Sequence, residues 1–206
     1  NRRGHSPFVL CPKCSWVAQC TDCQVSMTFH AKGAFLSCHY CNRRRTLPQV
    51  CDECHFNPLL YLGHGTQKIE DYLERAFPKA SIARMDRDTT SGRGGHAKIL
   101  GRFAKGEIDL LVGTQMIAKG HDYPGVTLVG VVNADTGLAL PDFRAAEQVF
   151  QLLTQVAGRA GRGDKPGNVL IQTYRPNHYA VQAAAKHDYH AFYAHEIAHR
   201  ERAQYP

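Results

Sequence analysis

All eight cysteines of this 206-residue chain lie between positions 11 and 54, and this grouping constrains the fold more than any other feature of the sequence. They form four Cys-x-x-Cys pairs: Cys11/Cys14, Cys20/Cys23, Cys38/Cys41 and Cys51/Cys54. Four such pairs supply two complete tetrahedral sets of thiolate ligands, which make closed, structural zinc sites with no position for a catalytic water. The alternative is the disulfide framework of a secreted protein. Residues 55–206 contain no cysteine, which favours a reducing compartment and hence two zinc ions.

Three ways of combining the four pairs into two sites are open. Five residues separate the first two pairs, whereas the 14 residues between the second and third pairs contain an alternating apolar stretch with Val25, Met27 and Phe29. Such alternation is typical of a hairpin in a zinc ribbon. We therefore favour a nested arrangement, with an inner zinc on Cys20, Cys23, Cys38 and Cys41 and an outer zinc on Cys11, Cys14, Cys51 and Cys54. With eight thiolates available, we do not expect the nearby His30, His39 and His55 to be ligands.

The surface of this cysteine-rich segment has two interpretations. Trp16, Phe29, Tyr40 and the basic triplet at residues 43–45 would suit a face that binds nucleic acid or a protein partner. Alternatively, the aromatic residues pack a small core and the arginines are solvated. Eight thiolates and two zinc ions would together lower the formal charge from +7 to +3, so an argument for nucleic acid depends on where the charges lie.

Beyond residue 58 the pattern changes to short apolar runs that alternate with amphipathic segments. Strands that alternate with helices predict an α/β fold, in which a parallel sheet has helices on both faces. The expected strands cover residues 59–62, 81–85, 108–113, 126–133 and 169–173, and the expected helices cover or include residues 65–77, 98–103, 144–160 and parts of 177–204.

The segment QVAGRAGR, residues 155–162, closes the longest of these predicted helices. Arg159 and Arg162 are three residues apart, which on a helix would put both on one face. Two planar, permanently charged guanidinium groups suit a polyphosphate, although a fraying helix end with solvated arginines is the alternative. The sequence has no G-x-x-x-x-G-K-[ST] phosphate loop and no acidic box placed to hold magnesium. We therefore expect that this chain alone does not hydrolyse ATP.

QVAGRAGR resembles motif VI of superfamily 2 helicases, and LLVGTQMIAKGHDYPGVTLVGVVNAD, residues 110–135, resembles their motif V. Together with the four cysteine pairs, these motifs make the whole chain similar to the second lobe of the PriA family of bacterial replication-restart helicases. The resemblance implies a RecA-like lobe in residues 1–10 and 59–206, without its first strand, and an inserted two-zinc module in residues 11–58. It also implies the nested zinc pairing.

The resemblance further implies a role for several residues. ATP and Mg²⁺ would sit between this lobe and an absent upstream lobe that carries the magnesium ligands. The residues implied to be catalytic are Arg159 and Arg162, as arginine fingers, and Gln155. Gly120 and Asp122 would approach the nucleotide. The residues that would bind DNA are Thr114, Lys119, Arg87 and Thr89, with Arg144 touching either DNA or a motif carboxylate.

The activity implied by the resemblance is ATP-dependent 3′ to 5′ unwinding of DNA in replication restart and primosome assembly at stalled forks. The implied partners are single-stranded and forked DNA, single-strand-binding protein and primosome proteins that include the replicative helicase. The resemblance also implies a bacterial, nucleoid-associated protein. We expect it to be cytoplasmic and to have no membrane segment, because the longest apolar run is far shorter than the ~20 residues that cross a bilayer. The alternative function is a non-enzymatic, fork-binding or loading scaffold with a zinc ribbon on an inactive RecA-like platform.

HEIAH, residues 195–199, matches the H-E-x-x-H motif of zinc metalloproteases. A catalytic zinc there would need a third protein ligand, and the longer metzincin pattern fails because Arg202 stands where it has glycine. In a histidine-rich segment we expect a chance match.

Overall fold

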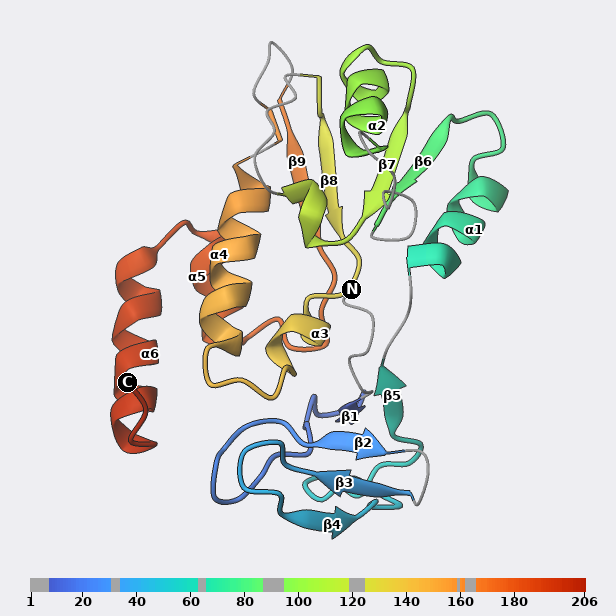
Figure 1. Ribbon diagram of the computed structural model, residues 1–206. Coiled ribbons are helices and arrows are strands. Elements are labelled where there is room, and N and C mark those ends of the chain that lie inside the picture. The colour runs from blue at the N-terminus through green and yellow to red at the C-terminus, as the bar shows by residue number, and fades with distance from the viewer. Residues whose placement is uncertain are drawn as a thin grey trace. The chain divides into compact units, whose positions relative to one another are not determined.

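The computed structural model describes residues 8–30, 34–62, 66–86, 95–118, 125–158, 160–161 and 166–206 (Figure 1). The chain forms two compact units. One consists of Asn1–Arg3, His64–Val129 and Gln155–Leu170, and the other of Gly4–Gly63, Gly130–Thr154 and Ile171–Pro206. The cysteine-rich module therefore shares a unit with the C-terminal helices.

The cysteine-rich module is built on short antiparallel strands. Strand β1 (Phe8–Leu10) pairs with β5 (Leu60–Leu62), and these two strands flank the module in the sequence. Between them, β2 (Thr28–His30), β3 (Phe35–Ser37) and β4 (Arg44–Thr46) form a three-stranded antiparallel sheet. The β2–β3 pair confirms the predicted hairpin. Strand β4 was not predicted, because two of its three residues are arginine and none is apolar.

The same unit contains most of the helices. They are α3 (Asp135–Leu138), α4 (Ala145–Ala157), α5 (Tyr179–Ala185) and α6 (Tyr189–Arg202). The last three residues of α4, from Gln155 on, belong to the other unit. Val149, Phe150 and Leu153 of α4 form a buried core with the alanines of α5 and with Phe192 of α6. This core is distinct from the one under the zinc module, which centres on Met27 and Leu36.

Helix α4 ends earlier than predicted. The sequence pattern predicted a helix to residue 160, but α4 ends at Ala157, and Ala160 and Gly161 form a turn. Gly161 has a φ of +78°, in the left-handed region that favours glycine. Glycine also has a low helix propensity, so the two glycines of QVAGRAGR oppose continuation of the helix. The prediction that the helix extends to residue 160 is therefore wrong, whereas Arg159 and Arg162, which were expected to share a helix face, lie outside the described residues.

The other unit contains a parallel pair of strands. Strand β6 (Ile82–Met85) pairs in parallel with β7 (Leu110–Gly113), and α2 (Gly95–Ala104) lies between them in the sequence. Helix α1 (Thr66–Ala76) packs on both strands, and a short 3-10 helix, η1 (Gln115–Ala118), follows β7. This strand–helix–strand unit confirms the predicted α/β class.

A second strand pair joins β8 (Leu128–Val131) to β9 (Asn168–Ile171). Asn168 N donates to Thr127 O at 2.8 Å, and Gln172 N donates to Val131 O at 2.9 Å. The partner numbers rise together, as they do in parallel strands. Within the described part of the chain, the β6–β7 pair and the β8–β9 pair are two separate two-stranded sheets. No helix in that part has the length and apolar character needed to cross a membrane.

Candidate functional site

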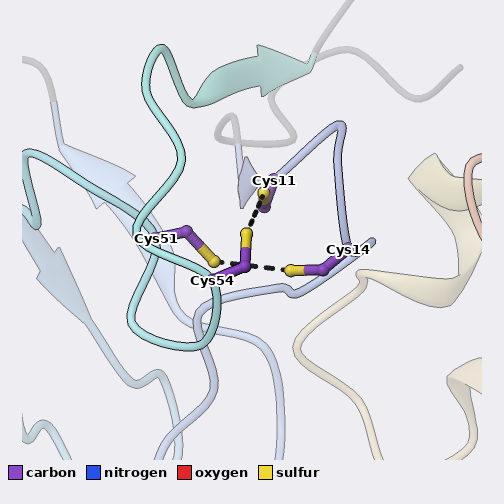
Figure 2. A group of neighbouring side chains, drawn as sticks. All are labelled: Cys11, Cys14, Cys51 and Cys54. Carbon is purple, nitrogen blue, oxygen red and sulfur yellow. Dashed lines mark hydrogen bonds between the residues drawn. The ribbon is translucent and has the colours of Figure 1, made fainter.

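The eight cysteines form two four-residue clusters in the nested arrangement that was predicted. The sulfur atoms of Cys11, Cys14, Cys51 and Cys54 all lie within 4.8 Å of one another, and Figure 2 shows them turned toward a common centre. The second cluster consists of Cys20, Cys23, Cys38 and Cys41. All eight are free cysteines rather than disulfides.

The geometry of both clusters fits zinc. Tetrahedral zinc with Zn–S distances of about 2.3 Å places its sulfur ligands about 3.8 Å apart. The Sγ atoms of Cys11 and Cys54 are 3.6 Å apart, and those of Cys20 and Cys41 are also 3.6 Å apart. Because each cluster supplies four thiolates, the donor sets are those of closed structural sites.

The four cysteine pairs share one backbone turn. In each pair, the residue after the second cysteine donates its N–H to the carbonyl of the first cysteine, at 2.9–3.0 Å. These four residues have φ between +52° and +64°; they are Ser15, Gln24, Asn42 and His55. The first cysteine in turn donates its N–H to the residue five positions later, as Cys11 N does to Trp16 O at 2.8 Å. This repeated turn presents both sulfurs of a pair on the same side.

Burial and hydrogen bonds separate the acidities of these thiols. Desolvation, together with hydrogen bonds to the other thiols of each cluster, raises the pKa of Cys14 and of Cys23 to about 12. Burial also acts on Cys11, but N–H groups of Cys14 and Lys13 outweigh it and lower the pKa of Cys11 to about 7. Zinc binds thiolates, so the binding of zinc to each site releases the protons of those cysteines that are still thiols in the metal-free protein.

The three histidines near the cysteine pairs belong to neither cluster, as predicted. His55 occupies the left-handed position of the last turn, and its side chain is exposed. His30 Nε2 lies 2.7 Å from Ser37 Oγ, and its ring stacks on Phe35 with the centroids 4.9 Å apart.

The basic triplet of the module makes contacts inside the module. Arg43 forms an ion pair with Asp22 at 2.6 Å, and Arg45 forms one with Asp52 at 2.8 Å. These two aspartates lie in different cysteine pairs, so the basic triplet connects an inner-site turn to an outer-site turn. Trp16 and Phe29 pack against the module core. These contacts favour the packing interpretation of the segment over a nucleic-acid face.

Motif V begins where it was expected to begin. Thr114 directly follows strand β7, and its carbonyl accepts from Ile117 N at 3.1 Å. The carboxyl ends of parallel strands are the usual ligand-binding edge of an α/β sheet. The other motif V candidates, Lys119, Gly120 and Asp122, lie outside the described residues, as do Arg87 and Thr89 after β6.

Motif VI is described only in part. Gln155 is exposed in the last turn of α4, whereas Arg159 and Arg162 lie outside the described residues. Past the helix, Gly161 lies so close to Gly167 that a Cβ on Gly161 would stand 2.8 Å from Gly167 N. Gly161 N also donates to Val126 O at 3.2 Å. The glycine therefore allows a close approach of two backbones, and not an extension of the helix.

Arg144 precedes the first turn of α4. Its Nε lies 3.3 Å from Asp142 Oδ1, and 56% of its side chain is exposed. Partial burial raises the pKa of Asp142, but hydrogen bonds from Arg144 and its charge outweigh this and lower that pKa. The guanidinium also lies over the Phe143 ring, 5.3 Å from the ring centroid.

The HEIAH segment has a structural role. Glu196 is buried, accepts from Tyr179 Oη at 2.6 Å and from Arg200 Nε at 2.8 Å, and therefore has the contacts of a packed residue rather than those of a general base. Within the described ranges, the two cysteine clusters are the only groups of three or more potential metal ligands. These contacts favour the interpretation of HEIAH as a chance match, which stays a prediction.

Comparisons with known proteins identify the class to which this fold and these sites belong. Residues 43–164 match the helicase conserved C-terminal domain, and residues 20–45 match the PriA DNA helicase Cys-rich region domain. The first match covers more than half of the chain, which therefore belongs to the helicase conserved C-terminal domain family.

Over its whole length the chain is similar to replication restart protein PriA. It is 54% identical to that protein of Bacillus subtilis (strain 168) over 206 residues and covers 26% of it. It is 50% identical over 210 residues to the protein of Synechocystis sp., of which it covers 25%. The identity to the protein of Haemophilus influenzae is 45% over 192 residues, which are 93% of this chain and 26% of that protein. The predicted resemblance is confirmed, and the chain spans about a quarter of the length of these relatives.

Proposed function

We propose that this chain is the second lobe of an ATP-dependent DNA helicase. The observation that carries the proposal is the match of residues 43–164 to the helicase C-terminal domain, because that range contains both motif V and motif VI. ATP and Mg²⁺ bind in the cleft toward an upstream lobe, which supplies the phosphate loop and the magnesium ligands. This lobe alone does not hydrolyse ATP.

Motif VI supplies the charge that ATP hydrolysis needs. Arg159 and Arg162 reach the γ-phosphate, assisted by Gln155, and Gly120 and Asp122 approach the nucleotide. Arginine fingers in general raise the rate of phosphoryl transfer by about 10³- to 10⁵-fold. Because the arginines bind well only while the γ-phosphate is present, hydrolysis releases the two lobes, and this cycle of closure moves the protein along DNA.

Motif V holds the DNA strand. The position of Thr114 at the carboxyl end of β7 supports a contact from its hydroxyl to a DNA phosphate. Lys119, Arg87 and Thr89 contact further phosphates, and Arg144 contacts DNA or a motif carboxylate. Contacts to phosphates position a strand without reading its sequence, as a translocating enzyme requires.

The two cysteine clusters hold structural zinc ions. The module, residues 11–58, is an insertion in a lobe formed by residues 1–10 and 59–206. The antiparallel pairing of β1 with β5 supports this division, because it brings the two ends of the module together. Zinc supplies folding energy to a segment that is too small to build a large apolar core.

The proposed biological setting is that of the relatives, which are replication restart proteins. We propose that the whole protein unwinds DNA in the 3′ to 5′ direction at stalled forks and assembles the primosome. Its partners are then single-stranded and forked DNA, single-strand-binding protein and primosome proteins that include the replicative helicase. It works at the nucleoid in the bacterial cytoplasm.

Steady-state ATPase activity tests the proposal. The whole helicase, with its upstream lobe, is assayed with and without single-stranded DNA as wild type, as Arg162→Ala and as Arg202→Ala. Arg202 is the matched control, because it is an exposed arginine on α6 with no proposed role. We expect DNA-stimulated turnover that falls about 100-fold or more in Arg162→Ala and is unchanged in Arg202→Ala. Absence of stimulated turnover in all three proteins would leave the non-enzymatic fork-binding scaffold.

A further inference from the structure

A tyrosine far along the chain contacts the turn of the inner zinc site. Tyr205 Oη donates to the carbonyl of Cys23 at 2.9 Å, although 182 positions separate the two residues. The Tyr205 ring stacks on Phe143, with the centroids 4.8 Å apart and the planes 11° apart. Tyr40, which lies between the last two inner-site cysteines, meets Tyr205 edge to face at 6.3 Å. Tyr205 therefore connects the turn of the inner zinc site to Phe143, which lies two positions before the start of α4.

The end of α6 directs Tyr205 to this place. Tyr205 N donates to Arg200 O at 2.9 Å and Gln204 N donates to Glu201 O at 3.2 Å, and Gln204 has a φ of +56°. These bonds and the left-handed residue form a Schellman motif, which reverses the chain at a helix end. The orientation of Tyr205 is thus set by backbone geometry.

Phe143 is tied in turn to α4. The guanidinium of Arg200 lies over the Phe143 ring, 5.2 Å from its centroid. Arg200 Nη2 donates to Glu147 Oε2 in the first turn of α4 at 2.6 Å, and its Nε donates to Glu196 Oε1 of α6 at 2.8 Å. Only 16% of the Arg200 side chain is exposed, so these charge-assisted bonds are shielded from solvent.

We propose that Tyr205 and Phe143 form an aromatic bridge that makes the order of α4 depend on the inner zinc site. When zinc orders the turn at Cys20–Cys23, the Cys23 carbonyl holds Tyr205, Tyr205 holds Phe143, and Phe143 with Arg200 holds the start of α4. Helix α4 ends at Ala157, next to the glycine of motif VI. Tyr205 and Phe143 are thus positioning residues. Their effect on how ATP hydrolysis is coupled to unwinding rests on the proposed function, whereas their effect on α4 does not.

Hydrogen exchange tests the bridge without any enzymatic assay. The amides of Val149, Phe150 and Leu153, which are buried in the helical core, are followed in the whole protein with zinc and after chelation. In the wild type we expect zinc removal to speed their exchange by roughly tenfold. In Tyr205→Ala we expect these amides to exchange fast even with zinc bound. Zinc removal should then raise their exchange rate by less than about twofold, because the variant has lost the coupling between the zinc site and α4. An equal response to zinc in the two proteins would overturn the bridge.

Two further comparisons separate the bridge from general damage. Tyr193→Ala removes an exposed tyrosine of α6, the helix that precedes Tyr205, and should keep the wild-type response to zinc. Gln204→Ile leaves Tyr205 intact but opposes the left-handed φ, so it should act like Tyr205→Ala, whereas Gln204→Gly should act like the wild type. Equal responses of the Ile and Gly variants would also overturn the proposal.

Activity then distinguishes the bridge from the proposed motor. In the whole helicase, Tyr205→Phe and Tyr205→Ala should lower the number of base pairs unwound per ATP hydrolysed. If the wild type shows no DNA-stimulated ATPase, the proposed function fails while the exchange experiment still decides the bridge. If the wild type unwinds DNA and Tyr205→Ala unwinds as many base pairs per ATP, the link from the bridge to the motor is wrong.

Discussion

Five described non-glycine residues of the zinc module have a positive φ, and four of them come directly after the second cysteine of a pair. This conformation costs an L-residue about 1–2 kcal/mol, and asparagine and histidine tolerate it better than most. Zinc ligation offsets the cost, because the turn aims both sulfurs at one metal. The strain is therefore placed where ligand geometry requires it.

His55 allows a test of this interpretation, because its side chain is exposed and its φ is +54°. Replacement by valine should lower the free energy of unfolding by about 1–2 kcal/mol, since a β-branched residue opposes positive φ. Replacement by glycine should leave stability equal or higher. Urea unfolding and metal analysis check both variants. Loss of one zinc ion in His55→Gly would show that His55 is a ligand after all.

His178 should make stability depend on pH. Burial, with the nearby charges of Arg175 and His199, lowers the pKa of His178 to about 4. The unfolded value is about 6.5, so between these two values the unfolded chain binds more protons. Stability should be greatest above pH 6.5 and fall by up to about 3 kcal/mol as the pH drops toward 4.

The variant His178→Asn isolates this effect. In the wild type, His178 Nδ1 accepts from Ala180 N at 3.2 Å and so caps α5. Asparagine also caps helices but does not titrate. Unfolding by urea at several pH values should therefore show a steeper loss of stability in the wild type than in the variant. Zinc loss at low pH affects both proteins and cancels in the difference; parallel curves would contradict the prediction.

At the scale of elements, the β6–β7 pair depends on a glycine at the end of β7. Gly113 is the register partner of Met85. A Cβ on Gly113 would stand 2.5 Å from the Met85 carbonyl oxygen and 2.8 Å from Ile117 Cγ2. Strand β7 can lie close to β6, and η1 can pack on the end of β7, only because residue 113 has no side chain. Thr114 of motif V is placed by the same contact, as the next residue in the chain.

Gly113→Ala should therefore lower the free energy of unfolding by about 1–3 kcal/mol, because the backbone of β6 must move to accept a methyl group. Gly101→Ala is the matched control. Gly101 lies within α2, and a Cβ there meets nothing within 4 Å. That change should stabilise by about 0.5–1 kcal/mol through helix propensity. Thermal unfolding of both variants checks the prediction, and equal shifts would contradict it.

At the scale of the whole molecule, the zinc module and the C-terminal helices have separate cores within one unit. The module core includes four of its cysteines, whereas the helical core contains none. Metal removal should thus affect the two cores very differently. Contacts that join the two parts include the small buried cluster of Phe8, Leu10, Val17 and Ala139 and the contacts of Tyr205.

Trp16 reports on the module alone, because it is the single tryptophan of the chain and packs against the module core. Chelation of zinc should shift its fluorescence to longer wavelength and increase its quenching by acrylamide, since a metal-free ribbon loses its fold. The helical circular dichroism should largely remain. Simultaneous loss of both signals would show that the helical core also needs zinc.

The sequence by itself determined the features that depend on neighbours in the chain. The spacing of the cysteines specified eight zinc ligands, and the alternating apolar stretch after Cys23 selected the nested pairing. Apolar periodicity located α1, α4, β6 and β7 to within a few residues. Their signals are local, because a hydrogen-bonded turn or an apolar face repeats every few positions. Motif V and motif VI were recognised for the same reason, since each is a run of consecutive residues in the sequence.

Only the tertiary structure decided the contacts between distant parts of the chain. No local pattern pairs Arg43 with Asp22, Arg200 with Glu147, or Tyr205 with the Cys23 carbonyl. Each side chain has many chemically equivalent partners in the sequence, and the fold selects one by bringing it within about 3 Å. The end of α4 has both a local and a tertiary cause, since the glycines of QVAGRAGR oppose a helix and Gly161 turns where it meets the backbone of Gly167. The sequence therefore specified the ligands and motifs, and packing specified what connects them.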